Sequence, residues 1–198
     1  MDIKALIVIL MSTVLVNNYI LSQFLGCCPF LGVSKIIKNA VGMGTAVTFV
    51  MIIASAVTWP IQNYFLDKHG LGFLQIIVFV LVIGSLVQFL ELVLKKFIPA
   101  LYKALGVYLP LITVNCGLLG VTISNVNKEY SLTESLVNAF GAGLGFLLAM
   151  LIFSGIRGTL ENSDPPESFR GMPITLISAA ILSLAFFGFS GIIENLFG

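Results

Sequence analysis

Two stretches with the same pattern decide how this chain folds: Cys28-Pro29-Phe30-Leu31-Gly32-Val33 and Cys116-Gly117-Leu118-Leu119-Gly120-Val121. One stretch lies in each half of a chain that is otherwise almost wholly apolar. Polar groups within such membrane sequence are candidates for function. Because the two cysteines occupy matching places, we expect Cys28 and Cys116 to contribute to one site, for which a soft metal is the natural occupant.

The composition is that of a polytopic membrane protein. Of the 198 residues, 58% are hydrophobic and 10% are charged, whereas soluble domains carry about 25% charged residues. The net charge of +1 argues against nucleic acid as a partner, because phosphate neutralisation needs a basic face. The apolar run from Ile3 continues well past the length of a signal peptide, so we expect it to be retained.

Six segments are long and apolar enough to span a hydrocarbon core of about 30 Å, which takes about 20 residues per helix. They cover about 4–33, 40–62, 71–94, 100–125, 135–156 and 172–196. The prediction is an all-α polytopic protein whose single membrane domain covers 1–198 and contains six transmembrane helices. Lysine and arginine are more frequent in the first, third and fifth connections, which places these in the cytoplasm and both termini outside.

The chain divides into two repeats, about 1–97 and about 98–198. Besides the cysteine pattern, Asn39-Ala40-Val41-Gly42-Met43-Gly44 matches Asn138-Ala139-Phe140-Gly141-Ala142-Gly143. The cysteines are 88 residues apart and these glycine motifs 99, so the second repeat holds an insertion around 125–134. Each repeat has three spans, so the second enters the membrane upside down. This is an inverted-topology repeat.

Interrupted helices are expected in the first and fourth segments. Both segments contain residues that break helices, namely Gly26, Pro29, Gly32, Pro110, Gly117 and Gly120. Sites in inverted repeats often lie at such breaks near the bilayer midplane. We expect a half-helix with Cys28 near its cap and Pro29 at its first position, and a second half-helix capped by Asn115. A positive helix end would favour a thiolate there.

Two thiolates are half of the four ligands that a zinc or iron–sulfur site takes from sulfur, so the rest must come from another chain or copy. Cys27 aligns with Asn115 in the second repeat and has no matching cysteine there, so we expect its side chain to pack as a small apolar group. Residues expected to surround the cysteines are Gly26, Thr113, Asn115 and Gly117. We expect four polar residues either to line an ion path or to form helix interfaces, namely Asn17, Asn18, Gln23 and Glu91. Glu91 lies four residues before Lys95, which is the favourable order for an ion pair along a helix.

Long stretches of the chain closely resemble the A-type subunit of the Rnf complex, the ion-translocating ferredoxin:NAD⁺ oxidoreductase of bacteria. The stretches that carry the resemblance are Asn17-Asn18, 24–35, 109–116, Pro165-Pro166, 169–171 and 189–191. The pattern is shared with the related E-type subunit of the Na⁺-pumping NADH:quinone oxidoreductase. The stretches Cys28-Pro29-Phe30 and Val33-Ser34-Lys35 are more similar to the Rnf member.

The resemblance implies an electron-transfer subunit of a multi-subunit enzyme in the bacterial inner membrane, with no complete active site of its own. Cys28 and Cys116 would supply two ligands to one [2Fe–2S] cluster shared with a homologous E-type subunit of opposite topology. The B-, C-, D- and G-type subunits would carry further iron–sulfur and flavin centres, and electron flow would be coupled to Na⁺ or H⁺. The alternatives are the E-type member of the NADH:quinone oxidoreductase, a secondary transporter with inverted repeats, and a scaffold without cofactor.

Overall fold

The computed structural model describes residues 3–34, 37–66, 68, 72–97, 112–113, 115–161, 163 and 165–197. Throughout these residues the regular structure is helical, without strands, as the sequence predicts. The α-helices are α1 (Ile3–Met11), α2 (Cys27–Val33), α3 (Ile37–Ile61), α5 (Gln75–Phe97), α8 (Cys116–Asn127), α9 (Leu132–Glu161) and α10 (Met172–Phe197). π-helical turns follow α1 and α3, at Ser12–Val16 and Gln62–Leu66, and 3-10 turns at Gly72–Leu74 and Glu167–Phe169 precede α5 and α10.

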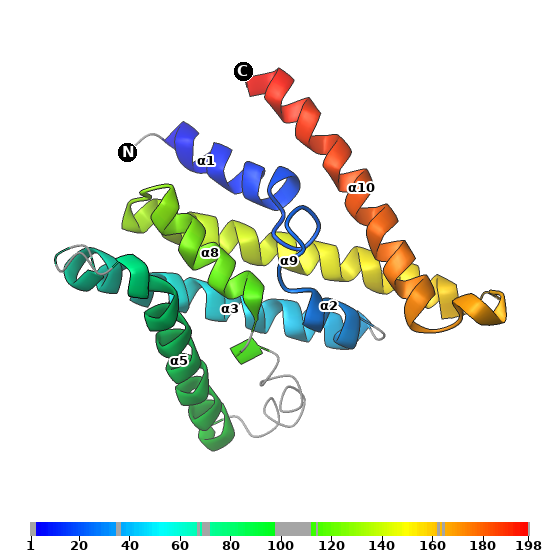
Figure 1. The fold of residues 1–198 in the computed structure, drawn as a ribbon, viewed down its shortest axis with the longest axis horizontal. Coiled ribbons are helices and arrows are strands. Elements are labelled where there is room, and N and C mark those ends of the chain that lie inside the picture. Colours follow the sequence, from blue (N-terminus) through cyan, green and yellow to red (C-terminus); the bar gives the residue numbers. More distant parts are fainter. Residues whose placement is uncertain are drawn as a thin grey trace.

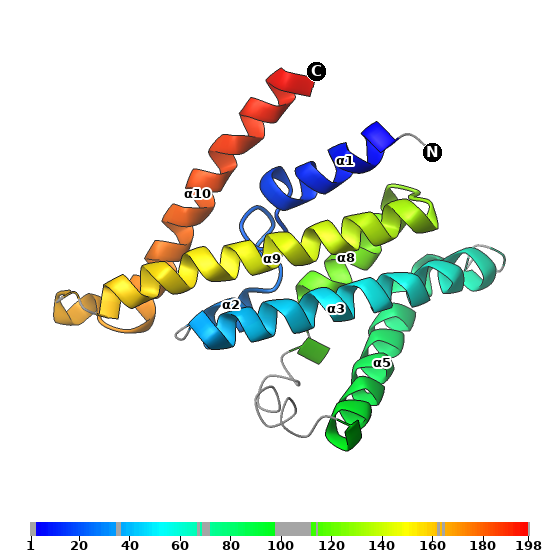
Figure 2. The ribbon, with the colours of Figure 1, turned by 180° about the vertical axis from the view of Figure 1, so that it is seen from behind.

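Helices α3 and α9 form the centre of the bundle. They lie side by side and run in opposite directions (Figure 1, Figure 2). Helices α1 and α8 pack against α9, α8 and α5 pack against α3, and α10 contacts the π-helical turn after α1. The core between these helices is apolar, and its largest buried side chains include Met43, Met51, Leu118, Met150 and Phe153.

Glycine allows the close approach of α3 and α9. A Cβ atom added to Gly44 on α3 would lie 3.1 Å from Cγ of Leu147 on α9. A Cβ atom added to Gly143 on α9 would lie 2.5 Å from Cγ2 of Thr48 on α3. The two contacts are reciprocal, because Gly143 and Leu147 are each 99 residues after Gly44 and Thr48. Small residues at such contacts let helix backbones pack tightly in membranes.

The first predicted segment is interrupted, as expected, over 17–26 between the π-helical turn and α2. Asn18 stabilises this break: its Oδ1 accepts a hydrogen bond from a backbone N–H of the break (3.1 Å), and its Nδ2 donates to the carbonyl of Gly145 on α9 (2.9 Å). The hydroxyl of Ser183 on α10 donates to the carbonyl of Leu21. Backbone groups in lipid need partners within the protein, so these contacts make a non-helical stretch tolerable there.

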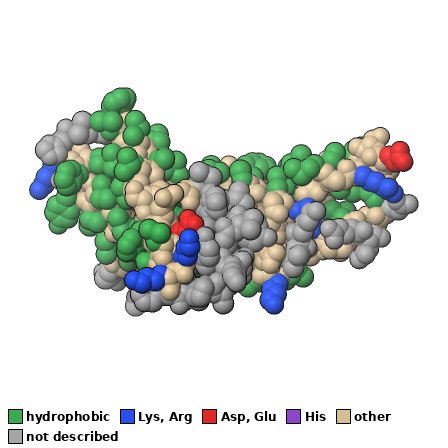
Figure 3. All heavy atoms as spheres, turned by 90° about the horizontal axis from the view of Figure 1, so that it is seen from below, with side chains coloured by type: hydrophobic (Ala, Val, Ile, Leu, Met, Phe, Trp, Pro, Cys, Tyr) green, Lys and Arg blue, Asp and Glu red, His purple; other side chains and the backbone are tan. Residues whose placement is uncertain are grey.

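The outer surface of the bundle is largely apolar. Figure 3 shows hydrophobic side chains gathered at the left of the view and along its upper edge, with Lys and Arg side chains scattered between the two ends. Large apolar side chains that are more than half exposed include Phe49, Leu81, Phe89, Leu92 and Leu184. A soluble monomer rarely exposes so large an apolar surface, whereas a hydrocarbon environment favours it.

Three helices are long and apolar enough to cross a membrane: Ile37–Leu66, Gly72–Val93 and Leu132–Leu160. They correspond to the second, third and fifth predicted spans. Leu6–Val16 and Met172–Gly188 are shorter apolar helices. The first part of the fourth predicted segment, 100–111 with Pro110, lies outside the described residues. Six spans and their inverted topology therefore stay predictions.

We expect Gly143→Ala to destabilise the bundle, because the new Cβ would overlap the side chain of Thr48, which is stiff at χ1. Overpacking of this kind costs about 1–3 kcal/mol, measurable as a lower midpoint of thermal unfolding in detergent. The matched control is Gly42→Ala on α3, where an added Cβ meets no heavy atom within 4 Å. Equal midpoints for the two variants would show that the α3–α9 contact is not tight.

Candidate functional site

The two cysteine motifs meet where α2 and α8 begin. Helix α2 begins at Cys27 and α8 at Cys116. The backbone N–H of Gly26, just before α2, donates a hydrogen bond to Sγ of Cys116 at 2.9 Å. Residues 24–28 and 115–117 together form what we call the α2–α8 junction. The contact joins a residue two positions before Cys28 to the first residue of the second cysteine motif.

Glycine is needed on the α2 side of the junction. Gly26 has a φ of +87°, a left-handed conformation that other residues adopt only with strain. A Cβ added there would also lie 3.1 Å from Oδ1 of Asn115, just before α8. A larger residue at Gly26 would therefore strain the turn and crowd Asn115.

The cysteines of the junction differ in exposure. Cys28 and Cys116 are exposed on the surface of the chain, whereas Cys27 is only partly exposed. The Cys27 thiol donates to the carbonyl of Phe24 at 2.9 Å, and it lies near enough to Cys28 and Cys116 to interact electrostatically with both. Cys28 and Cys116 are thus the exposed cysteines, although Sγ of Cys116 also accepts the hydrogen bond from Gly26, while Cys27 is bonded within its own turn.

The start of α2 differs from the prediction by two residues. The sequence predicts Cys28 near the cap and Pro29 at the first helical position, but Gly26 is the cap residue and Cys27 is the first. The left-handed conformation of Gly26 sets this earlier start. Pro29 is then the third helical residue, which is tolerated because the first N–H groups of a helix have no partner within the helix.

Asn115 caps α8, as predicted. Its side chain oxygen accepts a hydrogen bond from the N–H of Gly117 at 2.9 Å. Its amide nitrogen Nδ2 is buried and has no hydrogen-bond partner in the described part of the chain. A buried donor without an acceptor costs about 1–3 kcal/mol, so an acceptor beside this amide would be stabilising.

The other predicted residues lie around or away from the junction. Thr113 belongs to the short helical turn that precedes Asn115. The side chains of Asn17 and Asn18 bond to Ser12 and Val14 of the π-helical turn, to backbone N–H groups of the break and to α9. Gln23 is exposed within the break, and Glu91 is half-buried on α5. No three His, Cys, Asp or Glu side chains gather as a metal-binding group among the described residues.

Comparison with known proteins matches nearly the whole chain to one family. The family model described as "Rnf-Nqr subunit, membrane protein" matches residues 6–193. The chain belongs to the Rnf-Nqr family of membrane subunits.

Several relatives in this family are similar along their full length. The chain is 54% identical over 186 residues, 94% of this chain and 97% of the relative, to the A-type subunit of the "Na(+)-translocating ferredoxin:NAD(+) oxidoreductase complex" of Acetobacterium woodii. It is 50% identical to the A-type subunit of the "Ion-translocating oxidoreductase complex" of Syntrophotalea carbinolica, over 97% of this chain and 100% of the relative. The protein of the same name from Azoarcus sp. is 48% identical over 96% of this chain and 98% of the relative.

This member of the Rnf-Nqr family also contains a network of buried polar side chains that the cysteine and glycine motifs do not predict. Thr13 Oγ1 donates to Asn138 Oδ1 (2.9 Å), Asn138 Nδ2 donates to Asn125 Oδ1 (2.6 Å), and Asn125 Nδ2 donates to Ser55 Oγ (3.4 Å). The network joins the turn after α1 to α9, α8 and α3. The sequence does offer one indication of this network, because Asn138 is the first residue of the repeated glycine motif.

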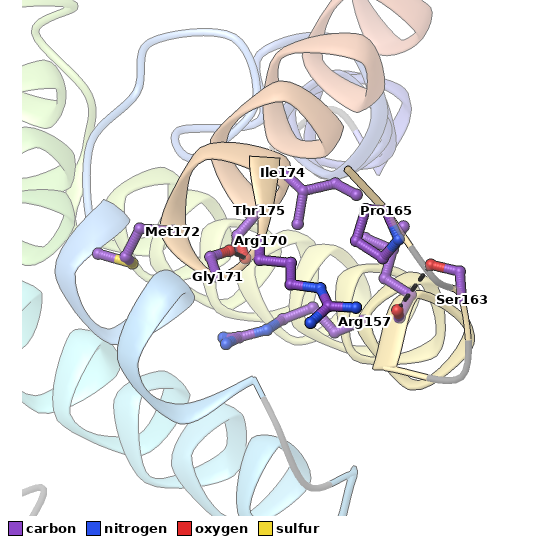
Figure 4. Close-up of a pocket in the computed structure, with 9 residues that line it drawn as sticks. Arg157, Ser163, Pro165, Arg170, Gly171, Met172, Ile174 and Thr175 are labelled. Atoms are coloured by element: carbon purple, nitrogen blue, oxygen red, sulfur yellow. Dashed lines mark hydrogen bonds between the residues drawn. The ribbon is translucent and has the colours of Figure 1, made fainter. Parts of the chain in front are cut away.

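Arg157 stabilises the other end of α2. Figure 4 shows its side chain extending from α9 toward α2. Its Nη1 donates to the carbonyl of Leu31 (2.6 Å) and to the hydroxyl of the buried Ser34 (2.9 Å). The sequence suggests no role for Arg157 beyond its contribution to the basic residues that orient the chain in the membrane. Cationic side chains at a helix C-terminus satisfy its last carbonyls and are favoured by its dipole.

We expect Arg157→Met to loosen α2, because the change removes both hydrogen bonds and the charge while keeping an apolar stem. Hydrogen bonds to charged groups are worth about 1.5–3 kcal/mol, so amide hydrogen exchange across Cys27–Ser34 should speed up by about tenfold or more. Lys38→Met, an exposed position at the start of α3, controls for loss of a charge. Unchanged exchange in Arg157→Met would mean that α2 is held by other contacts.

Proposed function

We propose that this chain is a membrane subunit of an ion-translocating ferredoxin:NAD⁺ oxidoreductase, in which Cys28 and Cys116 provide two thiolate ligands to a [2Fe–2S] cluster within the bilayer. Full-length similarity to proteins named as the A-type members of such complexes supports the assignment to the enzyme. The same names favour the Rnf complex over the E-type member of the NADH:quinone oxidoreductase.

The observation that carries the ligand proposal is the contact between the Gly26 amide and the Cys116 sulfur. It places Cys116 against the residue two positions before Cys28, and Cys28 and Cys116 are both exposed. An N–H group directed at sulfur is the kind of donor that tunes iron–sulfur centres. The exposed thiols and the N–H donor of the junction therefore fit a metal cluster that is bound through cysteine sulfur at the surface of this chain.

Two further features of the junction suit an anionic group. Helices α2 and α8 both begin there, and helix N-termini stabilise negative charge. The buried Nδ2 of Asn115 has no acceptor in the described part of the chain, and a cluster sulfur would supply one. The absence of a side chain at Gly26 lets its backbone N–H reach the sulfur of Cys116.

A [2Fe–2S] cluster passes single electrons, and one at mid-depth would divide a core of about 30 Å into two steps of about 15 Å. The residues of this chain would hold the thiolates, donate hydrogen bonds to sulfur and keep water out. Four cysteine ligands complete such a cluster, so the remaining two would come from a second chain at the exposed thiols. The coupling ion, Na⁺ or H⁺, belongs to the activity of the whole complex.

The partner would be a homologous E-type subunit of the same complex, in the opposite orientation. The inverted repeat predicted for this chain supports such pairing, because each half already contains the motif that a reversed copy would present. The reciprocal contacts of Gly44 with Leu147 and Gly143 with Thr48 are those expected of two halves related by a local two-fold axis. In this arrangement the termini lie outside, and the iron–sulfur and flavin centres of the B-, C-, D- and G-type subunits lie on either side of the membrane.

We expect Cys28→Ser and Cys116→Ser each to abolish one [2Fe–2S] signal in the purified complex, because a hydroxyl is a poorer ligand than thiolate for iron. Iron and sulfide content and low-temperature electron paramagnetic resonance measure the loss, and ferredoxin-dependent NAD⁺ reduction should fall with it.

Cys27→Ser is the matched control for both substitutions, since it removes a neighbouring thiol that is bonded to Phe24. Retention of subunit stoichiometry, measured by mass spectrometry, separates loss of the cluster from loss of assembly. A full signal in Cys28→Ser and Cys116→Ser would sink the ligand assignment and leave a cofactor-free scaffold or a transporter as the interpretation of the same fold.

A further inference from the structure

Helix α5 leaves one long face exposed. Its packed side is marked by Phe79, Ile83 and Val87, which are buried, and α3 and α8 are the helices of the bundle that α5 contacts. Figure 1 and Figure 2 show the C-terminal end of α5 leading away from the α3–α9 pair. On the opposite side, the exposed residues include Leu81 and Leu92. Most of this exposed face is apolar, as lipid would require.

One residue of the exposed face does not suit lipid. Gln88 is exposed and lies five residues before the end of the candidate membrane span Gly72–Val93, which is about 7.5 Å at 1.5 Å per residue. Helix side chains tilt toward the N-terminus of their helix. The Gln88 amide is therefore directed deeper into the hydrocarbon rather than toward the nearer membrane surface.

The Gln88 amide forms no hydrogen bond with the described part of the chain. Thr45, a polar residue that is also exposed on a membrane helix, differs in this respect, because its hydroxyl donates to the carbonyls of Val41 and Gly42 on its own helix. An amide in an apolar environment is costly unless it is hydrogen-bonded. Acyl chains offer no donor or acceptor, whereas a side chain of another protein does.

Gly84 lies one helical turn before Gln88 on the same face. A Cβ added to Gly84 would meet no heavy atom within 4 Å, so packing within this chain does not require glycine there. Glycine is also disfavoured in a helix relative to alanine. Membrane helices that associate combine small residues, which let the backbones approach, with polar side chains that hydrogen-bond between helices. Gly84 and Gln88 supply this combination on a face that the chain itself leaves exposed.

We propose that the Gly84–Gln88 face of α5 binds a transmembrane helix of another subunit, one that carries a hydrogen-bonding side chain at the depth of Gln88. This proposal rests on the part of the proposed function that places the chain in a complex of several subunits. It does not depend on the cysteine ligands, because the face includes no residue of the α2–α8 junction. Its test and the test of the ligands can therefore succeed or fail separately.

The test uses the native complex in its membrane, with the photo-reactive amino acid p-benzoylphenylalanine in place of Leu81. This position is 66% exposed and lies two turns before Gln88 on the same face. Irradiation should join this chain to a membrane span of another subunit, and mass spectrometry identifies the subunit and the crosslinked residue. Copurification of the other subunits from the same sample reports on the complex itself, so loss of the complex is distinguished from failure of the face.

Gln88→Leu should lower the yield of this crosslink by about threefold, the effect of one hydrogen bond between membrane helices. Gly84→Leu should lower it further, because the larger side chain would hold the two backbones apart. Thr45→Val is the matched control, since it removes an exposed hydroxyl that is already bonded within its own helix, and it should leave the yield unchanged.

Crosslinks from position 81 to lipid alone would overturn the proposal and assign the face to the bilayer, and crosslinks to this chain alone would overturn it too. An unchanged yield in Gln88→Leu would show that the amide makes no contact with a partner, and an equal loss in Thr45→Val would show that the effect is not specific to α5. If Gly84→Leu fails to assemble, Gln88→Leu and its control decide the outcome.

Discussion

The backbone amide of Gly26 and the sulfur of Cys116 are 2.9 Å apart, and the placement of the first cysteine motif beside the second depends on this contact. It forms only because the chain leaves helical structure over 17–26 and because no Cβ separates Gly26 from α8. A break of this kind exposes backbone groups that lipid cannot satisfy. Asn18 and Ser183 supply partners to it, so α9 and α10 stabilise the segment that brings the cysteine motifs together.

Helix α2 is fixed at both ends by the second half of the chain. With seven residues it is too short to be stable alone, since isolated helices shorter than about 12–15 residues are marginal. Cys116 contacts its beginning and Arg157 its end. The position of Cys28 is therefore set by residues far away in the sequence, and the close α3–α9 pairing at Gly44 and Gly143 provides the frame that aligns them.

Local patterns in the sequence predict the parts of this arrangement that depend on local chemistry. The interrupted first segment and the cap at Asn115 follow from glycine, proline and capping preferences. The spacing of the repeated glycine motif likewise marks the helices that pack most closely. The predicted start of α2 is wrong by two residues, because the conformation of Gly26 depends on its contact with α8. The partners of Arg157 and Asn125 could not be predicted, since they lie on helices whose relative rotation no local pattern specifies.

The exposure of Cys28 and Cys116 has a consequence for biogenesis in the proposed complex. Until a partner subunit binds, both cysteines stay exposed on the described part of the chain. Such a chain is most vulnerable to oxidation between insertion and assembly. Balanced synthesis of this chain and the partner proposed for it would shorten that interval, and surplus copies would be natural substrates for membrane proteases.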